Sequence, residues 1–234
     1  MIRRPPRSTQ GVSSAASDVY KRQPSIKAKN GGNPKNLVIL MHGIGADGND
    51  LIGLASHWSH NIPNTEFLSP NAPFNCDMAD TGHQWFGLVD KDKDRIKTEI
   101  SQVALIINHF IDDELKARNL DERNLVLAGF SQGAMLALHV GLRREKKCAG
   151  IMCYSGMLLD IENLESEIKS RPSILLVHGD VDPVITPLSL PEAETKLKNL
   201  KIPVEAHVRQ GLGHGIDAKG IEIGSTFLRK ILQS

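Results

Sequence analysis

The stretch NLVLAGFSQGAMLALHV, residues 124–140, constrains the fold of this chain more than any other segment. An apolar run ends at a glycine, a serine follows at position 131, and an alanine-rich segment with helical spacing begins after it. Gly129 and Gly133 flank Ser131, where a tight strand–turn–helix corner has no room for side chains. Such a corner exposes the hydroxyl and points the N–H groups of the helix start toward it. The segment therefore predicts a nucleophilic serine; the alternative is a structural corner with an incidental serine.

Apolar runs and amphipathic segments alternate along the rest of the chain. Runs that suit strands occupy residues 37–43, 65–70, 124–130, 149–155, 173–179 and 204–210. Segments with helical spacing occupy residues 49–61, 96–115, 134–144, 191–200 and 221–232. Residues 71–90 read as a long loop. Because strands alternate with helices and most runs are apolar throughout, the sequence predicts an α/β fold with a mostly parallel central sheet and helices on both faces.

The first 23 residues differ in composition from the rest. They are rich in Ser and Arg, show no period, and resemble the peptide that results when a sequencing adapter is translated. A transit peptide is the alternative. We expect residues 1–23 to be a disordered leader and residues 24–234 to form a single domain.

Charge, hydropathy and cysteine usage narrow the class of protein. The leader holds five basic residues and one acidic residue, which leaves 23 basic and 26 acidic residues in the remaining chain. That balance gives no basic face for nucleic acid, and no apolar stretch reaches the length of about 18 residues that membrane insertion needs. Three cysteines without C-x-x-C spacing fit a reducing compartment, so a cytoplasmic location is expected.

Polar residues gather just after the apolar runs. In a parallel sheet these positions meet at the carboxyl edge, where ligands bind. Ser131 follows the run 124–130, Asp180 and Asp182 follow the run 173–179, and His214 follows the run 204–210. The order serine, aspartate, histidine is that of α/β-hydrolases.

Each of these residue types has a role in acyl transfer. A serine hydroxyl needs a base to take its proton, and His214 can do so near neutral pH. An aspartate on the other ring nitrogen fixes the tautomer, and spacing alone does not choose between Asp180 and Asp182. The N–H of Gln132 and an N–H from the loop after the first strand, Ile44 in HGIG, are the predicted oxyanion hole.

Other candidates have plainer interpretations. His42 and His178 end apolar runs before a glycine, as hydrogen-bonded strand-end residues often do, and His139 suits packing on a helix. Trp85 and Phe86 stand side by side in the long loop. They are predicted to contact substrate as a wall of an acyl pocket; the alternative is that they only pin the loop.

Four motifs together resemble the phospholipase/carboxylesterase family of α/β-hydrolases, which includes acyl-protein thioesterases. They are LMHGIGADGNDL, GFSQGAML, HGDVDPVI and GLGHGID, in that order, and the likeness runs from about residue 24 to the end. The resemblance implies that Ser131 is the nucleophile, Asp182 the acid and His214 the base, with Ile44 and Gln132 in the oxyanion hole. It also implies no metal or other cofactor, a cytosolic location and a homodimer. The segment GHQWFG departs from the family pattern, which has Arg or Ser before Trp-Phe and Asp after it.

These observations predict a serine hydrolase that cleaves carboxylic esters or thioesters through an acyl-enzyme. Lysophospholipase and acyl-protein thioesterase activities use the same machinery, so small-molecule esters, lipid esters and acylated proteins are the candidate substrates. The alternative of another class is a catalytically silent α/β-hydrolase scaffold that binds a ligand or partner.

Overall fold

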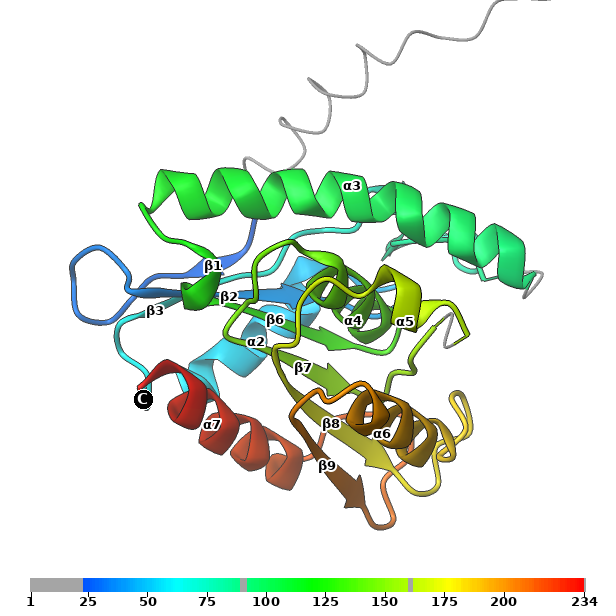
Figure 1. Ribbon diagram of the computed structural model, residues 1–234. Helices are drawn as coiled ribbons and strands as arrows, with labels where there is room; N and C mark the ends of the chain where they lie inside the picture. Colours follow the sequence, from blue (N-terminus) through cyan, green and yellow to red (C-terminus); the bar gives the residue numbers. More distant parts are fainter. Residues whose placement is uncertain (1–22, 89–91, 160–161, 234) are drawn as a thin grey trace, which may run out of the picture.

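The structure is a computed structural model that describes residues 23–88, 92–159 and 162–233. A seven-stranded sheet runs through its centre in the order β1-β3-β2-β6-β7-β8-β9 (Figure 1). The strands are β1 (Ser25–Ile26), β2 (Asn36–Met41), β3 (Thr65–Leu68), β6 (Leu125–Phe130), β7 (Gly150–Tyr154), β8 (Ser173–Gly179) and β9 (Val204–Arg209). Only β1 is antiparallel to its neighbour, so the prediction of a mostly parallel sheet is confirmed.

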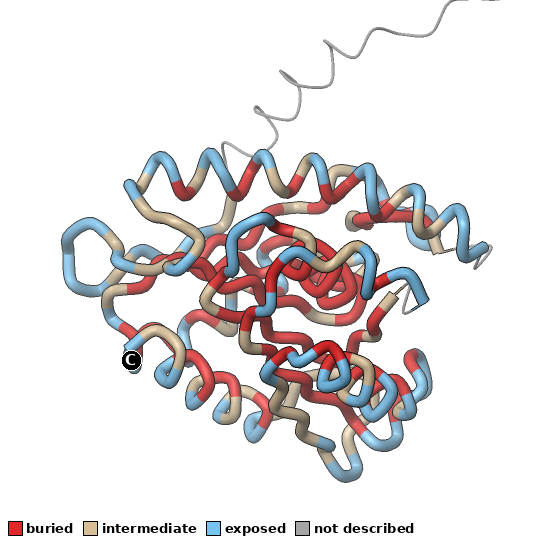
Figure 2. Tube along the Cα trace, viewed as in Figure 1, coloured by how far each residue is buried: buried red, intermediate tan, exposed pale blue. Residues whose placement is uncertain are grey.

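Helices cover both faces of the sheet. They are α2 (Gly48–Trp58), α3 (Lys93–Ala117), α4 (Gln132–Arg143), α5 (Leu164–Glu167), α6 (Ser189–Asn199) and α7 (Ala218–Leu232), with a 3₁₀ turn at Glu122–Asn124. Alternate residues of a strand face opposite sides. Leu37 and Ile39 of β2 pack in the core beneath α3, α4 and α6, whereas Val38 and Leu40 pack in the core beneath α2 and α7. Figure 2 shows the buried sheet between exposed outer helix surfaces. Two covered faces explain the uninterrupted apolar runs.

The elements that the sequence did not predict are all short. The predicted loop 71–90 contains a hairpin of β4 (Phe74–Asn75) and β5 (His83–Gln84) within its described part. The edge strand β1 has two residues and helix α5 has four. Segments of this length are too short to show a hydrophobic period.

The predicted leader lies outside the described residues except for its last residue, Gln23. The Oε1 atom of Gln23 accepts a hydrogen bond of 2.8 Å from the N–H of Asn71. Next along the chain, the Pro24 carbonyl accepts one of 3.0 Å from the N–H of Ser69. Gln23, one residue before the expected start of the domain, therefore already contacts the fold.

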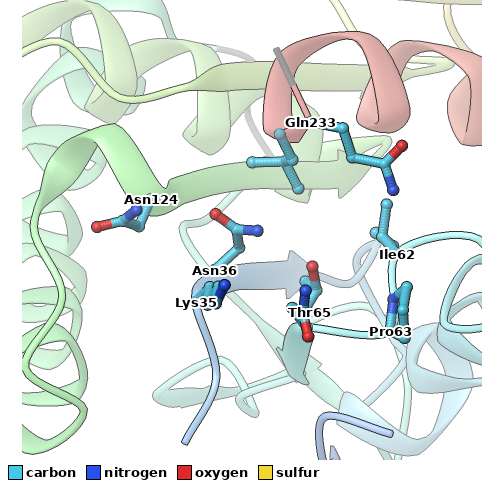
Figure 3. Close-up of a pocket in the computed structure, with 9 residues that line it drawn as sticks. Lys35, Asn36, Ile62, Pro63, Thr65, Asn124 and Gln233 are labelled. Atoms are coloured by element: carbon cyan, nitrogen blue, oxygen red, sulfur yellow. The ribbon is translucent and has the colours of Figure 1, made fainter. Parts of the chain in front are cut away.

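A cavity of about 360 Å³ opens at the amino edge of the sheet (Figure 3). Its wall includes Asn36 and Thr65, the first residues of β2 and β3, and Asn124, which precedes β6. Ser131 follows the opposite end of β6. The cavity and the predicted nucleophile therefore lie at opposite edges of the sheet.

Candidate active site

Ser131 occupies a strained corner between β6 and α4. Its φ of 53° and ψ of −118° are unusual for a residue with a side chain. A Cβ atom at Gly129 would lie 2.3 Å from the carbonyl carbon of Gly133, and one at Gly133 would lie 2.0 Å from the carbonyl oxygen of Met41. Both glycines are therefore sterically required at this corner. The Ser131 hydroxyl makes no capping bond to α4, which leaves it available to other groups.

Three segments that are distant in the sequence meet at the carboxyl edge of the sheet. The Oγ atom of Ser131 lies 3.0 Å from Nε2 of His214, and Nδ1 of His214 lies 2.8 Å from Oδ2 of Asp182. Because an ionised carboxylate only accepts hydrogen bonds, Nδ1 carries the proton. Nε2 is then free to accept the hydroxyl proton of Ser131. The structure thus brings together the three residues predicted as nucleophile, base and acid.

Asp182 is held as a carboxylate. Its side chain is fully buried, and Oδ1 accepts hydrogen bonds from the N–H groups of Val184 and Ile185 at 2.8 and 3.0 Å. Burial alone would raise the pKa of Asp182, but the hydrogen bonds from His214 and from the two N–H groups outweigh it and lower the pKa below its ordinary value. The group facing His214 is therefore negatively charged.

Asp180, the other candidate acid, has a different partner. Its exposed side chain accepts a hydrogen bond of 2.7 Å from the N–H of Gly211, in the turn after β9. The structure therefore places Asp182, and not Asp180, against the histidine. His178 also touches this carboxylate, because its buried Nε2 lies 3.1 Å from Oδ2 of Asp182 and 3.1 Å from the Ile185 carbonyl. Strand-end position alone did not reveal that contact.

The loop after β2 lies beside the serine. A Cβ atom at Gly43 would lie 3.5 Å from the Cβ of Ser131. Among the described residues, no protein acceptor is found for the N–H of Ile44 or of Gln132. Both N–H groups are thus available to an oxyanion, in keeping with their predicted role.

The pair Trp85 and Phe86 is buried, with exposed fractions of 0% and 1%. The indole Nε1 of Trp85 donates to the His42 carbonyl at 2.9 Å. The Gln132 side chain accepts from the Trp85 N–H at 2.8 Å and donates to the Phe86 carbonyl at 2.6 Å. These side chains present no surface to a substrate, so their predicted substrate contact is not supported and the alternative, that they pin the loop, fits the structure.

The Gln132 side chain had no role in the sequence-based prediction, which used only its backbone N–H. A long polar side chain at the first position of a helix is ordinarily solvated, whereas Gln132 is fully buried. Its two hydrogen bonds join the corner at Ser131 to the loop that carries Trp85. Neither partner could be inferred from spacing, because they lie 47 and 46 residues away.

Replacing Trp85 with alanine is expected to lower the free energy of unfolding by about 3–5 kcal/mol, because a buried indole is lost. Trp85→Phe, which removes the bond to His42 and part of the ring but keeps an aromatic side chain, should cost less, about 1–3 kcal/mol. Denaturant unfolding and assays with short and long acyl esters measure these effects. A rise in KM confined to long acyl chains, with unchanged stability, would restore the substrate-wall interpretation.

The described residues contain neither a cluster of metal ligands nor a membrane-spanning helix. No three His, Cys, Asp or Glu side chains are grouped there as a metal site requires. No helix in that part of the chain is long and apolar enough to cross a membrane.

A parallel sheet with a serine at a strand–helix corner, a histidine on its hydroxyl and a buried aspartate behind the histidine is the arrangement of serine hydrolases with the α/β-hydrolase fold. Comparison with known proteins identifies the family within this class of hydrolases. The chain belongs to the phospholipase/carboxylesterase family, whose model matches residues 22–232. This confirms the resemblance carried by the four motifs, and it makes the protein an ester hydrolase by class.

Individual relatives agree with the family. Acyl-protein thioesterase 1 homolog 1 from Dictyostelium discoideum is 27% identical over 203 residues, which cover 83% of this chain and 90% of the relative. The crystal structure of esterase PE8 is 38% identical with a TM-score of 0.86, and the match covers 90% of this chain and 98% of that one. The Bacillus cereus carboxylesterase, 19% identical with a TM-score of 0.75 over 95% of this chain and 100% of its own, supports the fold alone.

Proposed function

We propose that the protein hydrolyses carboxylic esters or thioesters through an acyl-enzyme formed on Ser131. The observation that carries this proposal is the unbroken series of contacts from the Ser131 hydroxyl through His214 to the buried Asp182 carboxylate. His214 is the general base and Asp182 the group that fixes its tautomer. Trp85 and Phe86 are left out of the proposed site.

The geometry supports a two-stage reaction. Nε2 of His214 takes the hydroxyl proton while Oγ of Ser131 attacks the carbonyl carbon, and the resulting oxyanion accepts from the N–H groups of Ile44 and Gln132. His214 then returns the proton to the leaving alcohol or thiol, which leaves the acyl group on Ser131. A water molecule, deprotonated by His214, attacks the acyl-enzyme; as the acyl–oxygen bond breaks, His214 returns the proton to Oγ of Ser131 and the carboxylic acid is released.

The substrate is proposed to carry an apolar acyl group, as a lipid ester or an acylated protein. The named thioesterase and esterase relatives support this class. Val181 and Val184, on either side of Asp182, are 59% and 67% exposed and offer apolar surface beside the site. A cytoplasmic location and a homodimer are further proposals, which rest on the family resemblance.

Hydrolysis of nitrophenyl esters and matching thioesters of increasing acyl length tests the proposal. The native protein should turn over at least one series, and Ser131→Ala should abolish turnover while keeping the melting temperature within a few degrees. Folded native protein that hydrolyses none of these substrates would contradict the proposal and favour a binding scaffold.

A further inference from the structure

His42 has a chemically defined hydrogen-bonding state although it lies outside the proposed triad. The residue follows β2 and is fully buried. Its Nδ1 lies 2.7 Å from the carbonyl oxygen of Gly43, and its Nε2 lies 3.0 Å from the N–H of Ala72. A carbonyl oxygen accepts and a backbone N–H donates, so Nδ1 carries the proton and Nε2 has the lone pair. Both contacts require the same neutral tautomer.

Burial favours that neutral form. Desolvation lowers the pKa of His42 below its ordinary value, although the bond to Gly43 acts in the opposite direction. A protonated ring would place a second N–H against the N–H of Ala72 and lose that contact. The ring is therefore a fixed donor to the Gly43 carbonyl.

The Gly43 carbonyl to which His42 donates belongs to the same peptide group as the N–H of Ile44. No cis peptide bonds occur in the described chain, and in a trans peptide the C=O and N–H point in opposite directions. A donor that fixes the Gly43 carbonyl therefore fixes the direction of the Ile44 N–H. The same carbonyl accepts one further, longer bond of 3.3 Å from the N–H of Ala46.

The neighbouring peptides of this loop are held by other groups. The N–H of Gly45 donates to the His83 carbonyl at 2.9 Å, and the N–H of His83 donates to the Ala46 carbonyl at 2.8 Å. These bonds tie the loop to the hairpin of β4 and β5 through groups on either side of the Gly43–Ile44 peptide, and neither of them is made by that peptide itself. His42 supplies the short bond that orients the plane of this peptide beside Ser131.

We infer that His42 is a positioning residue for the oxyanion hole: its Nδ1–H holds the Gly43 carbonyl and so aims the Ile44 N–H at the developing oxyanion. The inference rests on the proposed function, because it assumes that an acyl carbonyl is attacked at Ser131. An oxyanion contact forms fully only in the transition state, so its loss lowers kcat and leaves KM nearly unchanged.

Two substitutions at His42 separate positioning from packing. The amide nitrogen of asparagine stands as many bonds from the backbone as Nδ1, so His42→Asn keeps a donor for Gly43 and loses the contact with Ala72. The amide oxygen of glutamine reaches as far as Nε2, so His42→Gln keeps an acceptor for Ala72 and loses the donor for Gly43. Removing a whole oxyanion donor costs about 10²–10³ in kcat; misaligning it through His42→Gln should cost about 10–100-fold.

The test measures kcat, KM and melting temperature for both variants on the best nitrophenyl ester. We expect His42→Gln to lose kcat with KM unchanged within about threefold, and His42→Asn to stay within about fivefold of native kcat even where its melting temperature falls. Equal kcat in His42→Gln and native protein would overturn the inference, as would losses in both variants that follow only their stability.

Two further measurements show whether a negative result comes from misfolded variants, from a wrong proposed function or from a wrong role of His42. Nitrogen NMR of native protein with ¹⁵N-labelled histidine should show the His42 proton on Nδ1, and a proton on Nε2 alone would refute the inference even if neither variant folds. Native protein without any ester turnover would contradict the proposed function itself. Active native protein with fully active His42→Gln would contradict only the role of His42.

Discussion

Asp182→Asn is expected to leave the fold intact and to lower kcat by about 10⁴-fold, because an amide facing Nδ1 of His214 no longer enforces the tautomer that can accept the serine proton. The amide oxygen of asparagine can still accept from the N–H groups of Val184 and Ile185, which supports retention of the fold. Steady-state kinetics with a circular dichroism melt of the same sample measures the two effects.

Asp180→Asn is the matched control for this prediction. It lies two residues away, follows the same strand and bonds to the N–H of Gly211. The substitution keeps an acceptor oxygen there, so we expect a stability cost of at most about 1 kcal/mol and a change in kcat of less than about tenfold. An inactive Asp180→Asn beside an active Asp182→Asn would reverse the assignment of the acid.

Removing the base should have a larger effect still. His214→Gln leaves no group to take the Ser131 proton, and loss of the histidine from a working triad costs about 10⁶-fold in kcat. His109→Gln, on the exposed side of α3, is the control and should retain native kcat. Stopped assays at high enzyme concentration can follow the residual rate. Activity of His214→Gln within about 100-fold of native protein would show that another group acts as the base.

The architecture and the positions of the three residues of the proposed triad could be predicted because local pattern encodes them. Continuous apolar runs reflect strands covered on both faces, and Ser131 and Asp182 each follow such a run, whereas His214 follows the alternating segment 204–210. Parallel strands then bring their carboxyl ends to one edge. Spacing could not choose between Asp180 and Asp182, because both follow β8; the family resemblance favoured Asp182, and the structure places that carboxylate against His214.

The contacts between loops could not be predicted in the same way. Trp85 looked equally suited to a pocket wall and to a loop anchor, since composition does not show whether an aromatic side chain is covered. The bonds of Gln132 to the loop and of His42 to Ala72 join segments far apart in the sequence, and no periodicity links them. The hydrogen bonds that hold the oxyanion loop can therefore be identified only from the three-dimensional structure.

Labelling with a fluorophosphonate probe, followed by intact mass and peptide mapping, tests the central claim most directly. The probe phosphonylates a serine only when a base and an oxyanion site activate it. We expect one adduct per chain, on Ser131, absent in Ser131→Ala and strongly slowed in His214→Gln. Folded native protein that takes up no probe, or that carries the adduct on another residue, would contradict the assignment of Ser131 as an activated nucleophile.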